Sequence, residues 1–132
     1  HAPFILENIV FEVISIALAK GNAMLETIVH GTTDNFENEV IEATELVVVD
    51  FWASWCGPCR MLEPHLQRLA SVYPGRVKVV KVDVDEEADL AQQFQIRSVP
   101  TLFLYKNGSL IEAKSGLMHY PALENWVESR LN

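Results

Sequence analysis

The sequence predicts an α/β fold in which a central mixed β-sheet is flanked by helices on both faces. From residue 24 onward, apolar runs of strand length alternate with helical patterns, separated by short turns. Two of these runs, at 46–52 and 77–84, are almost continuously apolar, which is typical of strands buried on both faces. Asn107-Gly108 separates the last two expected strands, and this dipeptide favours the tight turn of an antiparallel hairpin. Parallel and antiparallel strands are therefore expected in one sheet.

Nine elements are expected, in the order β-α-β-α-β-α-β-β-α. Either Thr33 or Asp34 is expected to cap the first helix, because the oxygen of a short polar side chain accepts hydrogen bonds from the free backbone N–H groups at a helix start. Phe36, Val40 and Ile41 form the apolar side of that helix. The expected elements are a strand at 26–30, a helix from 33 or 34 to about 44, a strand at 46–52, a helix from the cysteine segment to about 73, a strand at 77–84, a helix at 87–94, strands at 101–105 and 109–114, and a helix at 120–131.

The composition fits one globular domain. A chain of 132 residues with a hydrophobic fraction of 49% has enough apolar surface for a core, and needs no metal or disulfide to hold it together. The net charge is −8. Nucleic-acid backbones and anionic membrane surfaces attract basic patches, so neither is expected as a main partner.

Residues 1–23 are expected to form a separate N-terminal extension, with the domain itself at 24–132. Twelve of the sixteen residues in 4–19 are apolar. On a helical wheel Asn8, Glu12, Ser15 and Asn22 share a narrow stripe, so a helix here would be largely buried. Its length of about 24 Å is short of a bilayer core of roughly 30 Å, which predicts no membrane span. We expect this segment to pack on the domain or on a second copy and to promote self-association. A tag or a targeting remnant is the alternative, since Ala17-Leu18-Ala19 resembles a signal cleavage site.

The two cysteines of the chain, Cys56 and Cys59, directly follow the buried strand at 46–52 and open a helix. Thiols at positions i and i+3 of a helix are neighbours and are close enough to form a disulfide. Cys56 lies where the backbone N–H groups are unpaired and the helix dipole is positive, which stabilises a thiolate. A stabilised thiolate attacks disulfides and is also a good leaving group, so this pair predicts thiol–disulfide exchange.

The cysteine pair has two other interpretations, a zinc site and a structural disulfide. A structural zinc site needs two further ligands, and the four histidines are scattered singly, so no metal site is expected. An inert structural disulfide would close too small a loop to stabilise the fold appreciably. Redox chemistry is the interpretation that the spacing and context favour.

The segment Phe51-Trp52-Ala53-Ser54-Trp55-Cys56-Gly57-Pro58-Cys59-Arg60 resembles the active-site segment of the thioredoxin family. The segments 82–85 (Val-Asp-Val-Asp), 99–101 (Val-Pro-Thr) and 106–108 (Lys-Asn-Gly) support this resemblance at similar separations. The resemblance covers about residues 25–132 and implies a thioredoxin-like fold. It also implies that Cys56 is the exposed nucleophile and that Cys59, more deeply buried, resolves the mixed disulfide.

Asp50 and Lys81 are charged residues within apolar strands, where burial is costly. Asp50 either lies at a partly solvated strand end or, as the resemblance implies, is a buried general base toward Cys59 with a raised pKa. Lys81 either faces solvent or, by the same resemblance, pairs with Asp50.

The resemblance further implies a flat apolar rim that binds a substrate peptide through its backbone. A cis peptide is implied between Val99 and Pro100, beside the cysteines. The Val99 backbone would then offer strand-like hydrogen bonds, and Gly116 would let the peptide approach. The rim residues are Trp55, Gly57, Pro58, Val99, Pro100 and Gly116.

The implied activity is reduction of disulfides in other proteins, with no bound metal or organic cofactor. Thioredoxin reductase is the implied partner that re-reduces the protein with electrons from NADPH, and the implied location is cytoplasmic. An extracytoplasmic thiol reductant is the alternative if residues 1–23 are a targeting remnant. A redox-independent binding or chaperone-like module is an alternative of another class, which the intact cysteine pair and Asp50 disfavour.

Overall fold

The computed structural model describes residues 28–132. The extension expected at 1–23, its helix and the boundary after it lie outside the described residues. Within the described part the nine elements follow the predicted order, and their bounds are β1 (Ile28–His30), η1 (Glu37–Ile41), β2 (Leu46–Trp52), α2 (Gly57–Val72), β3 (Val77–Asp83), α3 (Ala88–Gln93), β4 (Thr101–Lys106), β5 (Ser109–Ser115) and α4 (Tyr120–Glu128).

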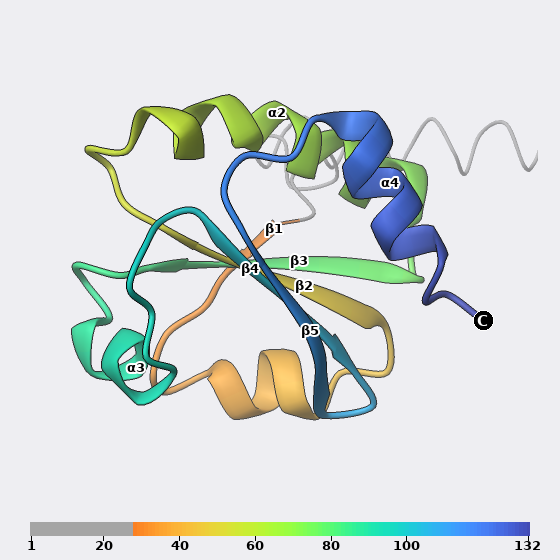
Figure 1. Cartoon of the computed structure of the whole chain (residues 1–132). Helices are drawn as coiled ribbons and strands as arrows, with labels where there is room; N and C mark the ends of the chain where they lie inside the picture. The colour runs from red at the N-terminus through yellow and green to blue at the C-terminus, as the bar shows by residue number, and fades with distance from the viewer. Residues whose placement is uncertain (1–27) are drawn as a thin grey trace, which may run out of the picture.

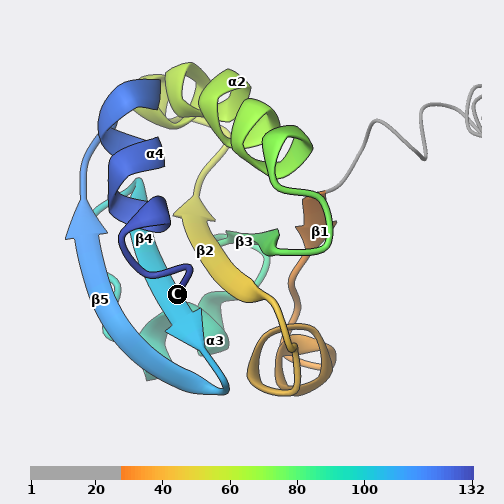
Figure 2. The same ribbon diagram turned by 90° about the vertical axis from the view of Figure 1, so that its right-hand side faces the viewer.

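These strands form one sheet in the order β1-β3-β2-β4-β5. β3 pairs in parallel with β1 and β2, whereas β4 pairs antiparallel with β2 and β5. Helices α2 and α4 cover one face of the sheet, and η1 and α3 cover the other (Figures 1 and 2). The predicted mixed sheet with helices on both faces is confirmed.

The central strand β2 is buried on both faces, as its apolar run predicts. Val48 packs with Leu66 of α2 and Leu123 of α4, whereas Val49 packs on the opposite side with Val40 of η1. Successive side chains of a strand point to opposite faces, so the even-numbered residues of β2 face α2 and α4. This alternation directs Asp50 into the layer beneath the active-site helix.

The cap expected at Thr33 or Asp34 is wrong. The N-cap of η1 is Phe36, which makes no side-chain cap hydrogen bond. In the turn before it, Thr32 N–H donates to Asn35 Oδ1 at 2.7 Å and Asn35 N–H donates to Thr32 Oγ1 at 3.1 Å. Thr33 instead donates its N–H to Glu87 Oε1 at 2.9 Å. The reciprocal Thr32–Asn35 hydrogen bonds satisfy the backbone N–H groups of these two residues. Thr33, which the sequence favoured as the cap, is instead held by its contact with Glu87.

The predicted hairpin turn at Asn107-Gly108 is confirmed. Asn107 has a φ of +52° and Gly108 a φ of +80°, the left-handed values that this turn requires at both central positions. A Cβ on Gly108 would lie 2.9 Å from the carbonyl oxygen of Ile41. Glycine is therefore required at position 108 both by its backbone angle and by the close approach of η1.

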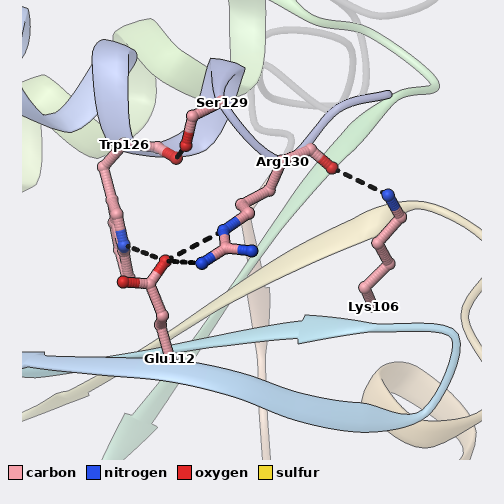
Figure 3. A network of polar contacts seen from close by, with 5 residues as sticks. All are labelled: Lys106, Glu112, Trp126, Ser129 and Arg130. Carbon is pink, nitrogen blue, oxygen red and sulfur yellow. Dashed lines mark hydrogen bonds and ion pairs between the residues drawn. The ribbon is translucent and has the colours of Figure 1, made fainter.

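A polar network ties α4 to the β4–β5 hairpin (Figure 3). Glu112 accepts hydrogen bonds from Trp126 Nε1 at 3.0 Å and from Arg130 Nε at 3.1 Å. Lys106 Nζ donates to the Arg130 carbonyl oxygen at 3.0 Å, and Ser129 Oγ donates to the Trp126 carbonyl oxygen at 2.7 Å. The contacts of Glu112 and Lys106 hold α4 and the residues that follow it against β5 and β4.

Candidate active site

Cys56 and Cys59 are joined by a disulfide at the start of α2, so the structure describes the oxidised form. Their Cα atoms lie 5.3 Å apart, within the ordinary range for a disulfide. Cys56 is the N-cap residue of α2, and Pro58 lies in its first turn, where the missing N–H of proline costs nothing. The sequence spacing therefore places both sulfur atoms where the prediction required them.

The helix start directs a backbone donor at the Cys56 sulfur. The N–H of Cys59 donates to Cys56 Sγ at 3.1 Å. In the reduced protein, the same N–H and the positive end of the helix dipole would stabilise negative charge on this sulfur. Cys56 Sγ also lies 3.6 Å from the carbonyl oxygen of Val99.

The expected difference in burial between the two cysteines is wrong for this oxidised form. Cys56 is 4% exposed and Cys59 is 3% exposed. Both cysteines belong to a small buried cluster with Ala53, against which Val99 packs. Exposure therefore does not distinguish an attacking from a resolving sulfur in this state.

Asp50 is completely buried in β2, so the partly solvated strand end is excluded. Neither carboxyl oxygen has a hydrogen-bond partner among the described residues. Burial raises the pKa of the Asp50 carboxyl from an ordinary 3.8 to about 7; the nearby Lys81 ammonium lowers it and the Glu63 carboxylate raises it. Asp50 therefore exchanges its proton near neutral pH.

Lys81 is also buried, which excludes the solvent-facing interpretation. The strand register places it beside Asp50, as the resemblance implied. Its ammonium, however, forms an ion pair with Glu63 of α2 and lies 4.3 Å above the centre of the Trp52 ring. The expected Asp50–Lys81 ion pair is therefore wrong in its partner, because Glu63 offers a carboxylate that is still partly hydrated and costs less to keep charged.

The segment before β4 lies against the disulfide. The Val99–Pro100 peptide bond is cis, in agreement with the resemblance. Gly116, which follows β5, has a φ of +93° and donates its N–H to the Pro100 carbonyl oxygen at 2.8 Å. A Cβ on Gly116 would meet nothing within 4 Å, so the space beside this residue is open.

The other expected rim residues lie on the surface around the disulfide. Trp55 is 68% exposed, and its indole N–H donates to Asp85 Oδ2 at 2.9 Å. Gly57 is half-buried and Pro58 is exposed. Trp55 and Val99 also border a cavity of about 130 Å³, whose other lining residues are Val84, Ile96, Arg97 and Ser98.

Within residues 28–132, no group of three or more His, Cys, Asp or Glu side chains is arranged to hold a metal ion. In the same part of the chain, no helix combines the length and the apolar character that crossing a bilayer requires. Cys56 and Cys59, the only cysteines in the sequence, are both engaged in the disulfide.

Comparison with known proteins places this site in a family. The family model described as Thioredoxin matches residues 27–129. The chain belongs to the thioredoxin family. A thioredoxin of Rickettsia felis is 40% identical over 100 residues, which cover 76% of this chain and 95% of that protein. A thioredoxin of Acidithiobacillus ferridurans is 39% identical over 82% of this chain and all of its own length, and thioredoxin 1 of Synechococcus elongatus is 43% identical over 76% of this chain and 94% of its own.

Membership of the thioredoxin family and the disulfide-linked pair at the head of α2 establish the class of reaction. The protein is a thiol–disulfide oxidoreductase that acts by dithiol–disulfide exchange through Cys56 and Cys59. The predicted fold class and reaction are confirmed.

Two residues of this thioredoxin site had no assigned role in the sequence-based prediction. Asp85, part of the Val-Asp-Val-Asp segment, orients the Trp55 indole. Glu63 holds Lys81; its only signal in the sequence is its place one helical turn after Cys59. That spacing puts both side chains on one side of α2, which the hydrophobic pattern alone does not distinguish from a solvated position.

Proposed function

We propose that Cys56 is the attacking and Cys59 the resolving cysteine in the reduction of disulfides in other proteins. The Cys56 thiolate attacks one sulfur of the substrate disulfide and releases the other as a thiolate. The Cys59 thiol then loses its proton and attacks Cys56 Sγ, which releases the second substrate thiolate and forms the Cys56–Cys59 disulfide. Two electrons pass from the protein to the substrate. The observation that carries the assignment is the Cys59 N–H directed at Cys56 Sγ, because it favours negative charge on the first sulfur.

Asp50 is the general base that takes the proton from Cys59 in this proposal. Two observations support this role: α2 covers the face of the sheet from which the Asp50 side chain emerges, and the Glu63 carboxylate, which raises the pKa of Asp50, lies one helical turn after Cys59. A carboxyl with a pKa of about 7 is matched to proton transfer at neutral pH.

The rim around the disulfide is the proposed substrate surface. Backbone groups of Val99 would bind an extended peptide as an added strand, and the open space at Gly116 leaves room for it. Exposed Trp55 and Pro58 and half-buried Gly57 border the approach to the sulfurs. Pro100 is buried and is joined to Val99 by the cis peptide bond. Recognition of backbone atoms rather than side chains favours a broad range of protein substrates.

Re-reduction by thioredoxin reductase with electrons from NADPH, and a cytoplasmic location, are proposed from family membership. The acidic balance of the chain, with a net charge of −8, is compatible with protein substrates in place of nucleic acid.

The reduction potential of the pair tests the proposed direction. Equilibration with glutathione, followed by quantifying the two redox forms, is expected to give a value near the roughly −270 mV typical of thioredoxins. A value above about −200 mV, in the range of oxidising and isomerising proteins, would contradict a reductant.

The segment 1–23 is proposed to promote self-association. Light scattering is expected to give more chains per particle for the full chain than for residues 24–132. The reason is that removing a largely apolar segment removes the surface through which copies would associate. An equal state of association in the two proteins would exclude this role.

A further inference from the structure

Three ionisable side chains meet beneath the active-site helix, and only one of them is a cation. Asp50 of β2 and Lys81 of β3 are neighbours in the parallel register, so their side chains emerge on the same face of the sheet. Glu63 reaches the Lys81 ammonium from α2, which covers that face. Two carboxyl groups therefore compete for a single buried ammonium.

Glu63, and not Asp50, is the partner of Lys81. Glu63 forms the ion pair with Lys81, and the Lys81 ammonium also lies over the Trp52 ring. Asp50 is left with both oxygens buried and without a hydrogen-bond partner among the described residues. A buried carboxylate in this position would be strongly destabilised, whereas a protonated carboxyl is tolerated.

We propose that Glu63 is a positioning residue for the redox reaction, which holds the Lys81 ammonium away from Asp50 and so keeps the Asp50 carboxyl able to bind a proton. The inference rests on the proposed role of Asp50 as the base toward Cys59. The role of Glu63 can be tested separately, because Glu63 determines which carboxylate pairs with Lys81, whereas Asp50 accepts the proton of Cys59.

The other charged groups around the pair do not alter this assignment. His30 of β1 is opposite Lys81 in the register, and Asp83, Glu86 and Glu87 line with it a cavity of about 240 Å³ that Lys81 also borders. On the other side, the neighbour of Asp50 on β4 is the uncharged Leu102. Among these acidic residues and Glu63, Glu63 is the one that forms an ion pair with Lys81, and it is the carboxylate that acts on the pKa of Asp50.

The charges of Lys81 and Glu63 act on the pKa of Asp50 in the directions that this arrangement requires. Burial raises the pKa of Asp50, the Lys81 ammonium lowers it and the Glu63 carboxylate raises it. Removing the charge of Glu63 would delete a neighbouring negative charge and also free Lys81 to approach Asp50. Both changes favour the Asp50 carboxylate.

The direct test is a carboxyl carbon NMR titration of Asp50 in the full-length oxidised protein, in which the cysteines do not titrate. In the Glu63→Gln variant, the midpoint of the Asp50 titration is expected to fall by about one pH unit, a tenfold change in proton affinity. Glu39→Gln is the matched control, because Glu39 forms an ion pair with Lys78 of the same strand at 2.6 Å but outside this group. This control removes the same charge and is expected to leave the midpoint in place.

Two further measurements separate the proposal from its basis. Glu63→Asp, which retains the carboxylate, is expected to restore a midpoint close to the wild-type value. In Glu63→Gln, the pH dependence of the Cys59 step is expected to move to lower pH together with the Asp50 midpoint. An unchanged or raised Asp50 midpoint in Glu63→Gln would overturn the role of Glu63. A lowered midpoint without any change in the pH dependence of the Cys59 step would retain that effect on Asp50 and refute Asp50 as the base.

Discussion

Replacing Cys56 with serine is expected to abolish disulfide reduction, whereas replacing Cys59 with serine is expected to trap substrate as a covalent adduct. A serine hydroxyl at position 56 does not ionise at neutral pH and cannot attack a disulfide, even with the Cys59 N–H directed at it. Without a thiol at position 59, the mixed disulfide on Cys56 has no internal thiol to release it. Insulin reduction and mass spectrometry of the reaction mixture measure the two outcomes.

A variant with serine at both positions is the control for trapping. It is expected to reduce no insulin and to form no adduct, because it has no thiol. Normal turnover by the Cys59→Ser variant, or adducts on Cys59 in the Cys56→Ser variant at the rate of the wild-type first step, would reverse or remove the proposed roles.

The oxidised Asp50→Asn variant is expected to be more stable than the wild type by about 4 kcal/mol at pH 8 and equally stable near pH 3. Folding raises the pKa of Asp50 from 3.8 to about 7, so the folded wild-type protein binds this proton more tightly than the unfolded chain. The free energy of unfolding of the wild type therefore falls as the pH rises from about 4 to about 7. Above that range, Asp50 causes no further decrease. Asparagine resembles the protonated carboxyl in shape and carries no charge, so the loss disappears. Denaturant unfolding at a series of pH values measures the difference.

An exposed aspartate provides the charge-matched control for this experiment. Asp34→Asn removes the same charge from the surface and is expected to change stability by less than about 0.5 kcal/mol at either pH. A constant difference between Asp50→Asn and wild type across the pH range would mean that Asp50 does not titrate near 7.

The same Asp50→Asn variant separates the two chemical steps. At neutral pH, resolution by Cys59 is expected to slow by roughly a hundredfold, the usual contribution of a general base, while attack by Cys56 slows less. Stopped-flow measurement of Trp fluorescence, together with quenched-flow detection of the mixed disulfide, follows both steps. Equal slowing of attack and resolution would exclude Asp50 as the base for Cys59.

Much of the fold was predictable because its signals are local. The unbroken apolar run of β2 and the Asn107-Gly108 turn are each encoded in a few neighbouring residues, and both have the predicted structure. The first helix cap was mispredicted because the chain first forms a turn at Thr32–Asn35, and η1 begins only after Phe36. A contact with Glu87, 54 positions away along the chain, engages Thr33 instead.

The active site was likewise predicted in part. Cys56 and Cys59 were identified from a short motif, the cis peptide before β4 was implied by the family resemblance, and the two segments meet in the structure. The similar burial of the two cysteines was not predicted, because in the oxidised form both pack in one small cluster with Ala53. No residue pattern along the chain distinguishes the oxidised from the reduced arrangement.

The amino-acid sequence by itself determined the order of strands and helices, the place of the cysteine pair at a helix start and therefore the class of reaction. The tertiary structure alone decided which carboxylate holds Lys81 and leaves Asp50 unpaired. The physical reason is that backbone geometry and hydrophobic periodicity act over a few residues, whereas the strength of an ion pair depends on distance and burial between segments that meet only when the chain has folded.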